Sequence, residues 1–203
     1  MLQKKIIFVP SYNLKNHRMI KKLLFMLALT SVLFFTACEK TDPEIPHQEE
    51  LITTVKYTLT PTSGGSAIVL SFQDLDGDGG NAAIIEGGTL EANQTYTGVL
   101  ELLNEEESPA EDITAEIQEE DEEHQFFFKS DISDLTITYD DQDGDGNPIG
   151  LNSKLATGAA QSGSITIILK HEPKKSATGV SDGDITNAGG ETDIEVTFPI
   201  DVQ

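Results

Sequence analysis

Apolar and polar residues alternate with a period of two over most of the chain after residue 50. In the last segment every second residue is apolar: Ile194, Val196, Phe198, Ile200 and Val202. Successive side chains of a strand point to opposite faces, so this pattern predicts a strand with one buried and one solvated face. The alternate residues of the segment, which include Asp193 and Glu195, are expected on the solvated face.

The same alternation continues upstream, between turns rich in glycine, asparagine and aspartate. It predicts seven further strands, at about residues 51–59, 68–72, 95–104, 124–129, 135–140, 152–157 and 165–169. About eight short strands with such turns are typical of an antiparallel β-sandwich. We therefore expect a mainly β fold, with residues 51–203 forming one sandwich domain that is long enough for a hydrophobic core.

One short helix is predicted between the third and fourth of these strands. Ser108 has the position of an N-cap, Pro109 that of the first helical residue, and Glu111 that of the acid in a capping box. Ala110, Ile113 and Ile117 form a narrow apolar stripe. Residues 101–123 contain many acids and no basic residue. The simplest interpretation of this acidic run is the solvated face of the helix.

A signal sequence precedes the predicted domain. A basic start at Met19 is followed by an apolar stretch over residues 23–35, which has the length of a signal peptide and is too short to span a membrane. The stretch ends in Phe-Thr-Ala before Cys38, which resembles a lipobox. We expect a lipoprotein signal peptide over residues 19–37 and an acylated Cys38; an ordinary secretory signal with an incidental cysteine is the alternative. Residues 1–18 add nothing to export and are interpreted as a non-native extension.

Cysteine usage and charge agree with an exported, anchored protein. Cys38 is the only cysteine, so the chain has no disulfide. Six of the 13 basic residues and none of the 35 acids lie in residues 1–37, which leaves seven basic residues and a net charge of −28. Such a chain repels nucleic acid and anionic lipid headgroups and attracts cations. Residues 38–50 are charged and contain two prolines, and we expect a flexible tether there.

An acidic loop motif occurs twice, as FQDLDGDGGN and YDDQDGDGNP. Each copy has aspartates at every second position, at a constant offset of 67 residues: Asp74, Asp76 and Asp78 in the first loop, Asp141, Asp143 and Asp145 in the second. Several carboxylates around a glycine-rich turn can bind Ca²⁺, although neither loop has the bidentate glutamate of an EF-hand, so a modest affinity is expected. The alternative is that Asp-Gly pairs simply form hairpin turns.

Two histidines lie at the ends of predicted strands. His124 and His171 each have the parity of the apolar residues on their strand, and a histidine in this position usually has a structural role. If the two met beside Glu120, Glu123 or Glu172, however, they would form a Zn²⁺ site with imidazole and carboxylate ligands. Motifs for nucleophilic, zinc-protease or nucleotide chemistry are absent, so we do not expect an enzyme.

Several segments together resemble a family of small Bacteroidota envelope lipoproteins: the signal ending at Cys38, QDLDGDG, LEANQTYTGVLELLNE, EEHQFFF, TYDDQDGDGNPIG and GDITNAGGETDIEVTF. The family is often labelled a type 1 periplasmic-binding-fold superfamily protein. That fold alternates strands and helices over two lobes, whereas this chain predicts one helix, so we expect the sandwich instead. The resemblance implies a cell-envelope address and a link to metal uptake.

Three functional hypotheses follow. The first is a binding module that captures or presents a metal cation for an outer-membrane transporter, held by its lipid on either face of the outer membrane. The second is a structural or adhesive lipoprotein whose acidic loops bind Ca²⁺ only for stability. An envelope enzyme with an unrecognised carboxylate site is the third. Metal content would separate the first two, since Zn²⁺ supports the first and Ca²⁺ alone the second.

Overall fold

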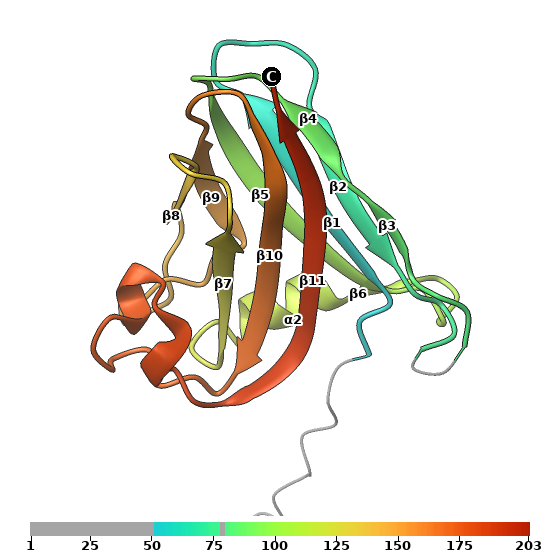
Figure 1. Ribbon diagram of the computed structural model, residues 1–203. Helices are drawn as coiled ribbons and strands as arrows, with labels where there is room; N and C mark the ends of the chain where they lie inside the picture. Colours follow the sequence, from blue (N-terminus) through green and yellow to red (C-terminus); the bar gives the residue numbers. More distant parts are fainter. Residues whose placement is uncertain (1–50, 78–79) are drawn as a thin grey trace, which may run out of the picture. The chain divides into compact units, whose positions relative to one another are not determined.

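The computed structural model describes residues 51–77 and 80–203. Cys38, the signal peptide, the tether and the N-terminal extension all belong to residues 1–50, and these predictions lie outside the described residues. The same holds for Asp78 of the first acidic loop. The described part forms two β-sheets with a hydrophobic core between them (Figure 1).

The larger sheet has seven strands in the order β3-β2-β1-β5-β9-β8, with β6 paired to β5. Its strands are β1 (Thr54–Pro61), β2 (Ile68–Gln73), β3 (Ile84–Glu86), β5 (Thr95–Asn104), β6 (Glu111–Asp112), β8 (Thr136–Tyr139) and β9 (Asn152–Ala156). The smaller sheet has the order β4-β11-β10-β7. Its strands are β4 (Gly88–Leu90), β7 (His124–Ser130), β10 (Gln161–His171) and β11 (Glu191–Val202).

The predicted fold class is confirmed: the described chain is mainly β, in a two-sheet sandwich with one short α-helix. Three strands were not predicted, namely β3, β4 and β6. Each has two or three residues, which is too short for an alternating pattern to be recognised. The sheets are antiparallel except where β4 runs parallel to the end of β11.

The helix, α2 (Ile113–Glu119), begins later than its predicted caps, so the predicted start at Ser108 is wrong. Glu111 and Asp112 pair with the end of β5 instead, and this ladder keeps their backbone extended. Asp112 is the N-cap, because its side chain accepts a hydrogen bond from the backbone N–H of Ala115 at 3.3 Å. The predicted apolar stripe is confirmed for Ile113 and Ile117, which are buried in the core. It was wrong for Ala110, which precedes the helix and is exposed.

The main core consists of the inward-facing residues of both sheets. The last strand contributes Val196, Phe198, Ile200 and Val202, as its alternation predicted. The core also contains one buried polar link, in which the hydroxyls of Tyr57 and Ser153 are 2.8 Å apart. Burial raises the pKa of Tyr57 to about 12, although the bond to Ser153 opposes the shift.

A second apolar cluster lies on the outer face of the smaller sheet. Phe127 of β7 and Ile168 of β10 pack there against Val180 and Ala188. The latter two belong to the segment after β10, which contains two 3₁₀ helices, η2 (Val180–Asp182) and η3 (Ile185–Asn187). Strand β7 is consequently buried on both faces, and the segment that covers it lies next to the strand ends that form the candidate site.

Candidate metal centre

The structure brings His124 and His171 together. The two are directly opposite each other in the antiparallel pair of β7 and β10, and their ring centroids are 4.7 Å apart in a stacked arrangement. Both lie at the end of the smaller sheet that is next to the C-terminal end of α2 (Figure 1). The register of this strand pair therefore places both rings side by side on one face of the smaller sheet.

A third candidate ligand, Asp193, comes from β11 through a β-bulge. The pairing of β10 with β11 passes from Leu169–Ile194 to Lys170–Thr192 and skips Asp193. A bulge of this kind re-aims the side chain of the extra residue. The alternation predicted Asp193 on the solvated face; this was wrong, because its side chain is 4% exposed and its Oδ2 atom lies 4.0 Å from Nε2 of His124.

A glycine keeps the start of β11 close to the end of β10. Gly190 has a φ of +65°, and a Cβ atom there would lie 2.1 Å from the carbonyl oxygen of His171. Any side chain at this position would push the two strands apart. Gly190 thus permits the close approach that places Asp193 beside the histidines.

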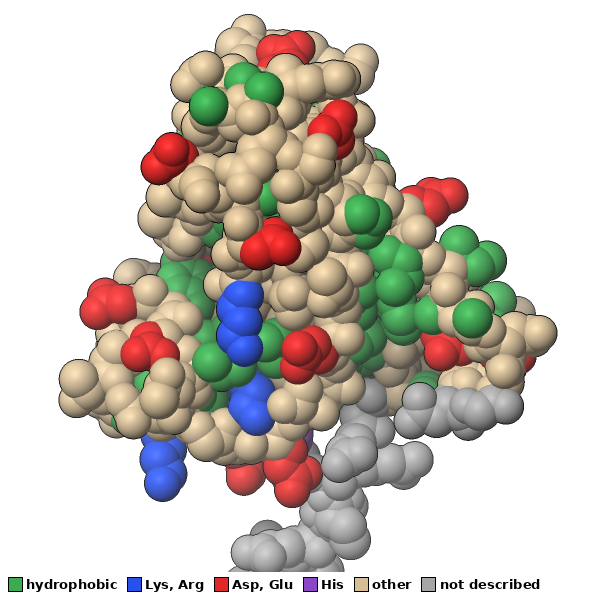
Figure 2. Space-filling model, viewed as in Figure 1, with side chains coloured by type: hydrophobic (Ala, Val, Ile, Leu, Met, Phe, Trp, Pro, Cys, Tyr) green, Lys and Arg blue, Asp and Glu red, His purple; other side chains and the backbone are tan. Residues whose placement is uncertain are grey.

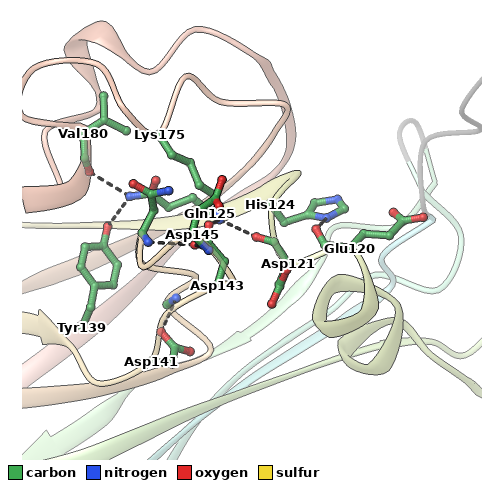
Figure 3. A network of polar contacts seen from close by, with 12 residues as sticks. Glu120, Asp121, His124, Gln125, Tyr139, Asp141, Asp143, Asp145, Lys175 and Val180 are labelled. Carbon is green, nitrogen blue, oxygen red and sulfur yellow. Dashed lines mark hydrogen bonds and ion pairs between the residues drawn. The ribbon is translucent and has the colours of Figure 1, made fainter.

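The backbone selects the tautomer of His124. Its Nδ1 atom lies 3.2 Å from the carbonyl oxygen of Glu120, which can only accept, so Nδ1 carries the proton (Figure 3). In the neutral ring Nε2 then has a free lone pair, and this is how metal-binding histidines are usually oriented. Burial lowers the pKa of His124, and His171 acts in the same direction, while the carbonyl of Glu120 opposes them. The neutral, ligating form is therefore favoured.

Two overlapping groups of potential ligands result. The inner group is His124, His171 and Asp193, and the outer group is Glu123, His171 and Glu172. Within each group, one ligand atom from each residue lies within 4.8 Å of the others. Glu123 is also close to the inner group, because its Oε2 atom is 3.8 Å from Nε2 of His171. Of the residues that the structure describes, only these form such groups.

The donor set suits Zn²⁺ or a similar divalent transition metal. Zn²⁺ binds imidazole nitrogen and carboxylate oxygen at about 2.0–2.2 Å, which puts the ligand atoms around a tetrahedral ion roughly 3.3–3.5 Å apart. The separations of 4.0 Å for His124–Asp193 and 3.8 Å for His171–Glu123 need only small side-chain rotations to reach this spacing. Two imidazoles with carboxylates favour such metals over Ca²⁺ or Mg²⁺, which take oxygen ligands.

In the second acidic loop, the aspartate side chains accept hydrogen bonds from other groups of the protein. Asp143 is buried, and its Oδ2 atom accepts a hydrogen bond from Nζ of Lys175 at 2.9 Å (Figure 3). Its Oδ1 atom accepts from the backbone N–H groups of Asp145 and Asn147. Burial alone would raise the pKa of Asp143, but the bonds from Lys175 and the backbone outweigh it and hold the pKa below its usual value.

The other loop aspartates are engaged in a similar way. Asp141 accepts bonds from the backbone N–H groups of Gly150 and Asn152, both at 2.7 Å. In the first loop, Asp76 accepts from the backbone and side chain of Asn81, and Asp74 accepts from the backbone of Gly77. No aspartate of either loop joins a ligand group among the described residues. These contacts support turn formation, while Ca²⁺ binding by the loops stays a prediction.

Lys175 connects the second acidic loop to the histidine site. Besides Asp143, its ammonium group donates to the backbone carbonyl of Asp121, in the turn that carries Glu123 and His124 (Figure 3). Sequence reasoning missed this lysine, because nothing in its sequence context distinguishes it from the neighbouring Lys174. It also missed Asp193, for which the alternating pattern offered no signal. Acidic side chains are spread over the face shown in Figure 2. Lys175, in contrast, is buried.

Comparisons with known proteins add little. No protein-family model matches the chain, and a search of curated proteins finds no match. Among solved structures, domains 4 and 5 of the S-layer protein SbsC are 14% identical, with a TM-score of 0.28, over 72% of this chain and 75% of that chain. A similarity this low carries no argument about fold or function. Among the described residues, no helix has the length and apolar character needed to cross a membrane.

Proposed function

We propose that this protein is a lipid-anchored envelope module that binds a divalent transition metal, with Zn²⁺ as the expected ion, at the inner group. The observation that carries the proposal is the convergence of the His124 and His171 rings with a buried carboxylate, Asp193. A module of this kind captures the cation or presents it to an outer-membrane transporter. It performs no chemistry on the ion.

Buried polar atoms at the site support metal binding. Nε2 of His124 and Oε2 of Glu123 are both inaccessible to solvent and have no hydrogen-bond partner. Leaving a buried polar group unsatisfied is destabilising by about 1–3 kcal/mol, and native structures rarely do so without a reason. A cation bound at the inner group would satisfy Nε2 of His124, and one bound at the outer group would satisfy Oε2 of Glu123.

The net charge and the N-terminal sequence support a location in the cell envelope. A net charge of −28 after signal removal raises the local concentration of cations around the protein. The signal that ends at Cys38 would place this acidic domain outside the inner membrane, where metal ions are captured for import. The binding site, the charge and the anchor thus agree in one role, and the resemblance to envelope lipoproteins supports the same role.

Zinc binding by the full-length protein, without a polyhistidine tag, tests the proposal. We expect one Zn²⁺ per chain in competition with a chromophoric chelator. Asp193→Asn is expected to raise the Kd by roughly 100-fold, since even outer-shell changes raise it 10- to 100-fold. Glu195→Gln, which removes the same charge from the exposed face of the same strand, is the matched control. Equal affinities of the two variants would refute the inner group as the site. Stabilisation by Ca²⁺ without Zn²⁺ binding would favour a structural role.

Membrane anchoring is tested separately. If Cys38 is acylated, the wild-type protein should partition into the detergent phase with membrane proteins, because an acyl chain adds about 0.8 kcal/mol of membrane affinity per buried methylene. Cys38→Ser should move the protein to the aqueous phase and abolish labelling by a fatty-acid probe. Equal partitioning of the two proteins would contradict the lipoprotein assignment, and it would leave the zinc measurement unaffected.

A further inference from the structure

The two ligand groups share one residue and differ in exposure. The exposed fraction of the side chain rises from 1% for His124 and 4% for Asp193 to 15% for His171 and 46% for Glu123. Glu172, the last member of the outer group, is also exposed. His171 therefore belongs both to a set of buried residues and to a set whose two acidic side chains are more exposed.

We propose that the outer group is an exchange position, through which the metal ion reaches and leaves the inner group while His171 stays bound to it. This inference rests on the proposed zinc-binding function of the inner group. It assigns different roles to the carboxylates. Glu172 binds the ion only in transit, whereas Asp193 holds it in the final site.

The transfer is an exchange of ligands. As the ion moves inward, its bonds to the carboxylate oxygens of Glu123 and Glu172 break, and bonds to Oδ2 of Asp193 and Nε2 of His124 form in their place. The carboxylates are ionised and the imidazoles neutral before and after the step, so no proton or electron is transferred. The reverse sequence releases the ion. The number of protein ligands is three at both positions, and the ion moves from more exposed to buried ligands.

The structure offers two reasons for such a path. A divalent cation is strongly hydrated, and it loses water readily only where protein ligands replace that water. The inner ligands are buried, so an ion that arrived at them directly would have to lose most of its water first. The outer carboxylates are also positioned together, because the N–H of Glu172 donates to the carbonyl oxygen of Glu123 at 2.7 Å. An ion bound there is already beside His171.

Stopped-flow kinetics of Zn²⁺ with the full-length, untagged protein test the exchange position. Association is measured by mixing with Zn²⁺, and dissociation by mixing the loaded protein with excess chelator. Glu172→Gln is expected to slow both by about fivefold, the effect of one unit charge at contact distance in a water-like medium. The Kd should stay within about twofold of the wild-type value, because a residue used only in transit affects both rates equally.

Glu122→Gln is the matched control, since Glu122 is an exposed acid in the same turn as Glu123 and belongs to neither group. It should slow association only slightly and leave dissociation unchanged. The exchange position is refuted if Glu172→Gln behaves like this control, or if it speeds dissociation as the loss of a permanent ligand would. Absence of Zn²⁺ binding by the wild-type protein at equilibrium would instead refute the proposed function itself.

Discussion

Replacing Lys175 by methionine is expected to lower the free energy of unfolding by about 3–5 kcal/mol, the range found when one partner of a buried ion pair is removed. The Lys175 and Asp143 side chains are 5% and 1% exposed, and their charged atoms are 2.9 Å apart. Methionine keeps the length of the side chain but leaves the Asp143 carboxylate buried without its cation. It also removes the donor to the carbonyl of Asp121.

Urea denaturation followed by circular dichroism measures this loss, because the chain has no tryptophan for fluorescence. Lys154→Met is the matched control. Lys154 forms an ion pair with Asp140 at the surface, where both side chains are about half exposed, and its removal should change stability by about 1 kcal/mol or less.

A second variant identifies the origin of the effect. Adding Asp143→Asn to Lys175→Met removes the uncompensated charge, while the amide oxygen can still accept the backbone bonds from Asp145 and Asn147. The double variant should therefore be less destabilised than the sum of the two single variants. A Lys175→Met protein as stable as the Lys154→Met protein would show that the pair makes no net contribution to stability.

Phe198→Ala is expected to lower the free energy of unfolding by about 3–5 kcal/mol, because it opens a cavity in the main core. Phe198 is fully buried in β11 and pairs with Ile165 of β10. It lies on the face that packs against the larger sheet, so the surrounding side chains are held by strands on both sides. The same denaturation experiment gives the value.

Glu195→Ala on the exposed face of the same strand is the control for Phe198→Ala, and it should change stability by about 0.5 kcal/mol or less. If the two substitutions had equal effects, the inward face of β11 would not be part of a close-packed core. The proposed Zn²⁺ ligand Asp193 lies on this strand as well. The zinc affinity of the Phe198→Ala protein would therefore show whether the position of Asp193 depends on packing of the core.

The candidate site joins the ends of three strands of the smaller sheet. His124 begins β7, His171 ends β10, and Asp193 lies near the start of β11. Metal binding there would connect the strands at the position where their ladder is interrupted by the bulge. Lys175, three residues after Glu172 of the outer group, connects the turn before β7 to the second acidic loop through its bonds to Asp121 and Asp143.

The sequence alone determined the sandwich and much of its core. Alternation places Val196, Phe198, Ile200 and Val202 on one face of a strand, and burial follows because a strand repeats every two residues. The sequence also predicted that His124 and His171 lie on the same strand face as the apolar residues near them. It did not predict the helix boundaries, because capping residues signal a local preference, and the pairing of β6 with β5 overrode it.

Only the tertiary structure decided which polar residues meet. The ring stacking of His124 on His171 depends on the register of two strands that are about 40 residues apart in sequence, and register is a property of the paired sheet. The inward turn of Asp193 depends on a bulge that breaks the very alternation used to predict its direction. The partner of Asp143 is set by the fold of the segment that carries Lys175 over the outer face of β7. Each of these contacts joins residues distant in sequence, so no local pattern along the chain could encode it.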